Sequence, residues 1–261
     1  MKLSPLLFFL LLFSIQGMAQ SPYQLNWRNE VSYHALGIGL LGAGSWIGNK
    51  TVQPLSESEI FALRRSSVIA FDRGATFNLS GAARTASDHT LNASFIMPML
   101  FLIPRRSRSE FGRIALLYSE VFFINLGGTN LMKRSTRRLR PFVYNELASI
   151  ESKQTKDARY AFFSGHTSAT AANTFFAARV FSDYYPDSKW KPLVWTVAVA
   201  LPAATGYFRV KAGKHFPTDV IAGGAFGAAV GWLIPQLHKT KSDDRLSFVA
   251  GPTGCYLAYK F

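Results

Sequence analysis

Apolar stretches that carry at most one charged residue recur along most of the chain, and they leave it few ways to fold. Six can be distinguished: residues 31–49, 89–104 and 114–132, the segment that follows residue 165, and residues 192–208 and 220–237. A helix of ~20 such residues is long enough to cross the hydrocarbon core of a bilayer. Glycines in the first and last of these stretches suit close helix packing. The sequence therefore predicts an all-α fold, a six-helix bundle embedded in a membrane.

The two ends of the chain differ from this pattern. Lys2 supplies a positive start, residues 6–13 form an unbroken apolar run, and small residues follow at 17–19, as in a signal peptide. An uncleaved anchor is the alternative. We predict a signal peptide at 1–19, an N-terminal helix and connecting region at 20–88, a helical core at 89–238 and a tail at 239–261. Loose alternation in the tail predicts a short β-hairpin that turns near residues 252–254.

The formal net charge of +14 suits an anionic partner such as nucleic acid, lipid head groups or a phosphorylated substrate. The most basic run, residues 133–141, taken alone is also typical of a cytoplasmic loop beside a membrane helix. Export and the flanking apolar helices argue against nucleic acid, so we expect no nucleic-acid partner. The single cysteine, Cys255, excludes an internal disulfide and a cysteine-based metal cluster.

The densest chemistry lies in residues 209–219, between two apolar stretches. Pro217 suits the first position of a helix, so Asp219 falls in the first turn of that helix. There its carboxylate can accept the Nδ1 hydrogen of His215 and leave Nε2 free as a nucleophile. The alternative is that Asp219 only complements the helix dipole and His215 is an ordinary loop residue.

A second candidate is the tripeptide Ser164, Gly165 and His166, which precedes a run of small residues. Ser164 is a plausible helix cap, and Gly165 lets a ligand approach the backbone. Free N–H groups at a helix start bind phosphate well. Together with Lys133, Arg140 and Arg209, this helix start can surround a tetrahedral oxyanion.

Three motifs in chain order then make the pattern specific: Lys133-x6-Arg140-Pro141, Ser164-Gly165-His166 and Arg209-x5-His215-x3-Asp219. They resemble the signature motifs of the type-2 phosphatidic acid phosphatase and vanadium haloperoxidase superfamily, over about residues 90–237. Two positions depart from the family pattern. Phe163 stands where proline usually precedes the second motif, and Phe208 stands where serine usually precedes the third. Neither replaces a group that would do chemistry, so they bear on loop shape and substrate fit.

The resemblance implies a metal-independent phosphatase with no cofactor. His215 would attack phosphorus and form a phosphohistidine, and Asp219 would orient its ring. His166 would protonate the leaving oxygen and then accept a proton from the attacking water. Five residues would bind the phosphate oxygens: Lys133, Arg140, Ser164, Gly165 and Arg209. The remaining histidines, His34, His89 and His238, are expected to be structural or surface residues.

Several functions fit these motifs. The leading one is hydrolysis of lipid phosphates such as phosphatidic acid, phosphatidylglycerol phosphate, a prenyl diphosphate or lipid A, at the bacterial inner membrane with the site facing the periplasm. A soluble periplasmic acid phosphatase acting on small phosphate esters is the alternative. A vanadium-dependent haloperoxidase is a third hypothesis, and a transporter or scaffold without catalytic activity is a fourth. If the signal peptide is cleaved and all six apolar stretches cross the membrane, the loop that carries Lys133 lies on the inner side of the membrane. That conflicts with a site facing the periplasm, unless residues 31–49 or residues 89–103 do not span.

Overall fold

The computed structural model describes residues 21–240, 246–251 and 254–259. The chain divides into two compact units, residues 23–241 and the two chain ends, and each is described by itself. The predicted signal peptide at 1–19 lies outside the described residues. So do residues 252 and 253, near which the tail was predicted to turn.

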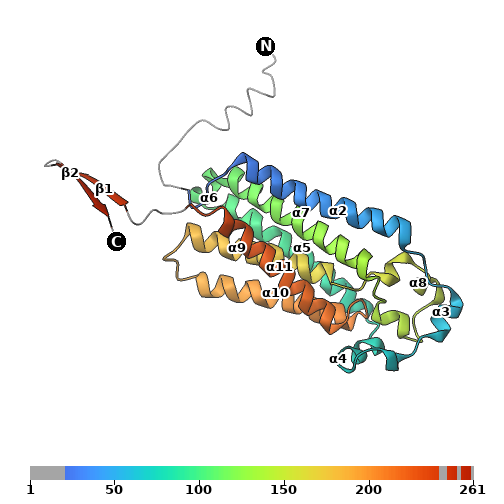
Figure 1. The fold of residues 1–261 in the computed structure, drawn as a ribbon. Helices are drawn as coiled ribbons and strands as arrows, with labels where there is room; N and C mark the ends of the chain where they lie inside the picture. The colour runs from blue at the N-terminus through green and yellow to red at the C-terminus, as the bar shows by residue number, and fades with distance from the viewer. Residues whose placement is uncertain (1–20, 241–245, 252–253, 260–261) are drawn as a thin grey trace, which may run out of the picture. The chain divides into compact units, whose positions relative to one another are not determined.

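The larger unit is built from helices (Figure 1). Its long helices, among the described residues, are α2 (Trp27–Thr51), α5 (Gly81–Met99), α7 (Phe111–Thr136), α9 (Gly165–Tyr184), α10 (Lys191–Lys211) and α11 (Pro217–Leu237). Shorter α-helices are α3 (Glu57–Ala62), α4 (Ala70–Arg73), α6 (Arg105–Ser109) and α8 (Ile150–Lys153). Five 3-10 turns complete it: η1 (Arg65–Ser67), η2 (Gly74–Phe77), η3 (Leu100–Leu102), η4 (Pro141–Tyr144) and η5 (Lys156–Arg159). The helical fold class predicted from the apolar stretches is therefore correct for this unit.

Helix α9 packs against α5, α7, α10 and α11, whereas α2 packs along α7 (Figure 1). The main core contains Leu117 and Val121 of α7 and Phe176 and Val180 of α9, all fully buried. Polar groups in α7 also face other helices, as is usual for polar residues among apolar ones in a membrane helix. Asn130 donates to the Leu41 carbonyl of α2 at 2.9 Å. This arrangement fixes the start of α9 against the ends of α7 and α10.

The predicted boundary between residues 88 and 89 falls inside α5. This helix begins at Gly81, where the Ser80 side chain accepts a hydrogen bond from the Ala83 amide. Its first two turns carry Arg84 and Asp88, so hydropathy marks only the apolar second half as a helix. The helix thus reaches from the core into the region that was expected to be a connecting surface.

Glycines on one face of α11 bring its backbone against α9, as the small residues predicted. A Cβ built on Gly223 would lie 2.5 Å from the Ser164 carbonyl oxygen, and one on Gly227 would lie 2.0 Å from the Ser168 carbonyl oxygen. Such distances force backbone atoms apart. The glycines therefore set the spacing between the two helices that hold the site.

Replacing Gly227 with alanine is expected to lower the free energy of unfolding by about 1–3 kcal/mol, the range for overpacking a close-packed contact. Gly39→Ala is the matched control, because its added Cβ meets no atom within 4 Å and helix propensity alone would stabilise it by up to about 1 kcal/mol. Thermal unfolding in detergent measures both. Equal melting temperatures for the two variants would contradict the close contact.

Three segments of the described residues are long and apolar enough to cross a membrane by length and composition: Phe111–Tyr144, Lys191–Lys211 and Pro217–Leu237. In the second unit, β1 (Leu246–Gly251) pairs with β2 (Gly254–Tyr259) in antiparallel register, with Leu246 opposite Tyr259.

Candidate active site

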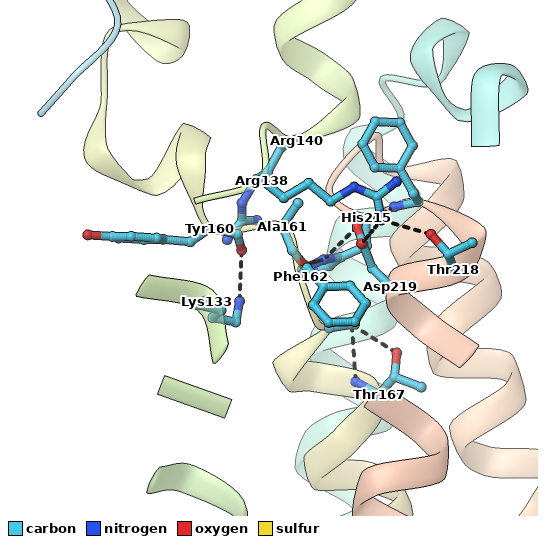
Figure 2. Close-up of polar contacts among 12 residues, drawn as sticks. Lys133, Arg138, Arg140, Tyr160, Ala161, Phe162, Thr167, His215, Thr218 and Asp219 are labelled. Atoms are coloured by element: carbon cyan, nitrogen blue, oxygen red, sulfur yellow. Dashed lines mark hydrogen bonds and ion pairs between the residues drawn. The ribbon is translucent and has the colours of Figure 1, made fainter. Parts of the chain in front are cut away.

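The segment between η5 and α9 connects the predicted site residues. Three of its backbone carbonyls accept hydrogen bonds from these residues. The Asp157 carbonyl accepts from Arg140 Nε at 2.9 Å, and the Tyr160 carbonyl accepts from Lys133 Nζ at 3.1 Å. The Ala161 carbonyl accepts from His215 Nδ1 at 2.7 Å. The amide of Ser164, at the end of this segment, donates to the Asp219 carbonyl at 3.0 Å. Figure 2 shows the lysine, the arginine and the histidine arranged around this segment. The three sequence motifs therefore meet in one place.

His215 is positioned by the turn that follows α10. Gly213 adopts a φ of 67°, a left-handed conformation that favours glycine, and the His215 ring is then fully buried. Because a carbonyl only accepts, the bond to Ala161 places the ring hydrogen on Nδ1 and leaves the lone pair on Nε2. Burial, followed by the charges of Lys133, Arg140 and Arg209, holds the pKa of His215 well below its usual value. The imidazole is therefore neutral and carries a lone pair on Nε2.

Asp219 does not accept the Nδ1 hydrogen of His215, contrary to the expected pairing. Its Oδ2 lies 3.7 Å from Nδ1 and accepts instead from the Phe216 amide at 2.8 Å. That bond caps the start of α11, so the alternative role at the helix terminus is realised. The carboxylate still faces the ring closely enough to stabilise a positive charge on the imidazole.

Arg138 holds this carboxylate from the other side. Its Nη1 lies 2.5 Å from Asp219 Oδ1, and its Nη2 lies 2.6 Å from Asp72 Oδ2 (the Asp219 contact is drawn in Figure 2). Both carboxylates are fully buried, whereas the arginine side chain is 28% exposed. The guanidinium also stacks 4.4 Å from the centroid of the Phe216 ring. Through Arg138, Asp72 therefore connects residues 70–77 to the start of α11.

Two buried arginines face the same region. Arg140 Nη2 pairs with Asp157 Oδ1 at 2.7 Å. Arg209 lies 3.3 Å from the Ser87 hydroxyl and 3.9 Å from an Asp88 oxygen, and its buried Nε has no hydrogen-bond partner within the described part of the chain. A buried guanidinium with an unused donor is costly, and a tetrahedral oxyanion would satisfy it.

The start of α9 adds hydrogen-bond donors. Ser164 is the N-cap, as predicted, and its Oγ lies 2.9 Å from the Thr167 hydroxyl. A Cβ on Gly165 would lie 3.2 Å from Thr129 Cγ2, so glycine permits close approach to the backbone. His166 Nε2 contacts Asp88 Oδ1 at 2.9 Å. This carboxylate orients the second histidine of the site.

Cavities open beside these groups. One of about 230 Å³ lies between α5, α7 and α9, has mainly apolar walls and includes Gly165 and His166. Another of about 440 Å³ lies between α9, α10 and α11 and reaches Thr167. A third, of about 520 Å³, includes Asp157 and Lys214, and burial together with the Arg140 charge lowers the pKa of Lys214 to about 8. Cavities with mainly apolar walls thus lie between the helices, and a more polar cavity lies beside Asp157 and Lys214.

Three residues of the site were missed by the sequence analysis: Asp72, Asp88 and Arg138. The two aspartates lie in residues 20–88, which were expected only to form an N-terminal helix and a connecting region. Arg138 stands among neighbouring basic residues with no feature that distinguishes it. The one available signal was that both aspartates are acidic residues in a strongly basic chain.

The sequence of this chain is similar to those of known proteins. The family model of the PAP2 superfamily matches residues 114–243. An undecaprenyl-diphosphatase of Sulfolobus acidocaldarius is 33% identical over 144 residues, which are 54% of this chain and 61% of the relative. A lipid A 1-phosphatase of Rhizobium etli is 35% identical over 146 residues, 55% of this chain and 57% of the relative. The matched part thus spans less than two thirds of these curated relatives.

Among solved structures, the chain is similar to the crystal structure of a transmembrane PAP2 type phosphatidylglycerolphosphate phosphatase from Bacillus subtilis. The identity is 17% and the TM-score is 0.48. The match covers 78% of this chain and 96% of that one.

Proposed function

Because the chain belongs to the PAP2 superfamily, we propose that it hydrolyses lipid phosphate esters through a phosphohistidine intermediate. One observation carries this proposal: a neutral, buried His215 lies among three cations and a helix start, with apolar cavities beside them. The enzyme class is a phosphoric ester hydrolase. The relatives named as lipid phosphatases support the same class of substrate.

In the first step, His215 Nε2 attacks phosphorus and the bond to the leaving oxygen breaks. The Nδ1 hydrogen stays on the ring, donated to Ala161, and the positive charge on the imidazolium is stabilised by Asp219 at 3.7 Å. A doubly protonated His166 donates its Nδ1 proton to the departing oxygen, because its Nε2 faces Asp88. Asp88 holds the His166 ring in place through its contact with Nε2.

In the second step, His166 accepts a proton from water, which attacks the phosphorus and releases inorganic phosphate and His215. The non-bridging oxygens are bound throughout by Lys133, Arg140, Arg209, the Ser164 hydroxyl and the Gly165 amide. Charge in the transition state is thus neutralised by fixed cations and N–H dipoles. These groups would supply the neutralisation that many phosphatases obtain from a divalent metal.

The substrate class follows from the apolar walls. An acyl or prenyl chain can occupy the cavity between α5, α7 and α9 while its phosphate reaches Arg209. We place the protein in the bacterial inner membrane as a six-helix bundle, with the site facing the periplasm. Purified protein should hydrolyse phosphatidic acid, prenyl diphosphate or lipid A at least about tenfold better, in kcat/KM, than a small chromogenic ester in detergent. Equal or better turnover of the small ester without detergent would favour a soluble-type acid phosphatase.

Chelation tests the metal-independent mechanism. With EDTA in excess, kcat at a temperature well below the melting temperature is expected to remain within about twofold of the untreated value, because the catalytic charges are protein groups. Phosphate release by the purified protein measures this. A loss of turnover that added Mg²⁺ restores would overturn the metal-independent mechanism.

A further inference from the structure

A second buried cluster lies at the opposite end of the long helices from the phosphate site. Glu30 comes from the first turn of α2, Glu120 from the middle of α7 and His238 from the end of α11. One ligand atom from each lies within 4.8 Å of the other two. At 1.5 Å per residue, His238 is roughly 30 Å along α11 from Asp219. The cluster is therefore separate from the proposed catalytic groups.

The three side chains present electron-rich atoms to one another. His238 Nδ1 donates to the Ile234 carbonyl at 2.8 Å, which leaves the lone pair on Nε2 directed at the carboxylates. Glu120 is fully buried, and both of its carboxylate oxygens lack a hydrogen-bond partner among the described residues, as does His238 Nε2. Buried carboxylates without a counter-charge are costly. A metal ion at the centre of the cluster, or a proton shared between the two carboxyl groups, would remove this cost.

The two distances between the histidine and the carboxylates fit a tetrahedral metal. His238 Nε2 lies 3.2 Å from Glu30 Oε1 and 3.4 Å from Glu120 Oε2. Ligands at ~2.05 Å from a tetrahedral zinc ion are separated by about 3.3 Å. Metal ligands are usually oriented by further hydrogen bonds. Here His238 donates to a backbone carbonyl, and the Asn26 amide donates to Glu30 at 3.1 Å.

We propose that Glu30, Glu120 and His238 bind a divalent transition metal, with Zn²⁺ the best fit and water as the fourth ligand. Imidazole with two carboxylates selects zinc or a similar ion over Mg²⁺, which prefers six oxygen ligands. His34, whose Nδ1 lies 3.9 Å from Glu120 Oε1, bonds to the Glu30 carbonyl and Ser119 hydroxyl and is not a ligand. The metal would link α2 to α7 and α11 and so stabilise the folded protein.

Metal binding is tested directly on the full chain in detergent, after removal of any affinity tag and of bound metal with EDTA. Titration with Co²⁺ should produce the visible absorption of a tetrahedral site at one equivalent, and Zn²⁺ should displace it. Zn²⁺ should raise the melting temperature of the wild type. Glu120→Gln and His238→Gln should each weaken Co²⁺ affinity at least about tenfold and remove the thermal shift.

The control is Glu146→Gln, which removes a carboxylate whose side chain is 88% exposed and should bind Co²⁺ as the wild type does. If the cluster holds only protons, the wild type will show no tetrahedral Co²⁺ spectrum and no Zn²⁺-dependent stabilisation, and the proposal is overturned. The wild-type titration alone decides this even if a variant does not fold. Retained kcat in metal-free protein would leave the phosphatase proposal standing in either case.

Discussion

His215→Asn is expected to reduce kcat by about 10⁴-fold or more, since it removes the proposed nucleophile on which the covalent route depends. The amide of asparagine keeps a donor for the Ala161 carbonyl, which His215 Nδ1 contacts at 2.7 Å. The fold should therefore survive the change. Hydrolysis of a lipid phosphate by purified protein measures the effect, with the melting temperature as a check on folding.

His89→Asn is the matched control for that variant, because His89 is exposed on α5, close in sequence to Asp88. Its kcat should equal that of the wild type. Residual hydrolysis by His215→Asn within about tenfold of the wild type would remove His215 as the nucleophile. Asp219→Asn should have a smaller effect, because Asp219 acts at 3.7 Å from Nδ1 and not through a hydrogen bond.

Arg138→Met should produce the largest loss of stability. Removing the guanidinium leaves Asp72 and Asp219, both fully buried, without the cation that contacts each of them. Breaking a buried ion pair by removing one partner costs about 3–5 kcal/mol, and the partial exposure of Arg138 places the expected loss near the lower end. Thermal unfolding in detergent, read by circular dichroism, measures it.

Arg137→Asn tests whether the effect is specific to this arginine. Arg137 is exposed, with a φ of 49° that asparagine tolerates, so the control should melt within a degree or two of the wild type. Adding Asp72→Asn to Arg138→Met should recover part of the loss, because one uncompensated charge disappears. A double variant less stable than Arg138→Met would contradict the ion-pair account.

The helical core could be predicted because apolar stretches and their glycines report directly on burial and close packing. Residues 220–237 were expected as a helix, and α11 runs from Pro217 to Leu237 with Gly227 against α9. The start of α5 could not be predicted in this way. Arg84 and Asp88 are polar because they face the site region, and hydropathy cannot separate them from a solvated loop.

The candidate site shows the same division. Motif spacing identified residues that the structure brings together, such as His215 and Arg209, whose backbones are joined by a hydrogen bond of 3.3 Å. It could not identify Asp72 or Arg138, whose contact joins residues 66 positions apart in the chain. For the same reason His238 was expected to be a structural or surface residue. Its carboxylate neighbours come from α2 and α7, and only the packing of helices brings them together.

The central claim is that phosphate passes through His215, and trapping that intermediate tests it most directly. His166→Ala lacks the base for the second step, and an activated aryl phosphate needs no acid for the first, so the phosphoenzyme should accumulate. Mass spectrometry of the quenched protein should then locate an acid-labile, alkali-stable phosphate on His215, absent from His166→Ala/His215→Asn. Turnover of the aryl phosphate with no phosphate on His215 under these conditions would contradict the account.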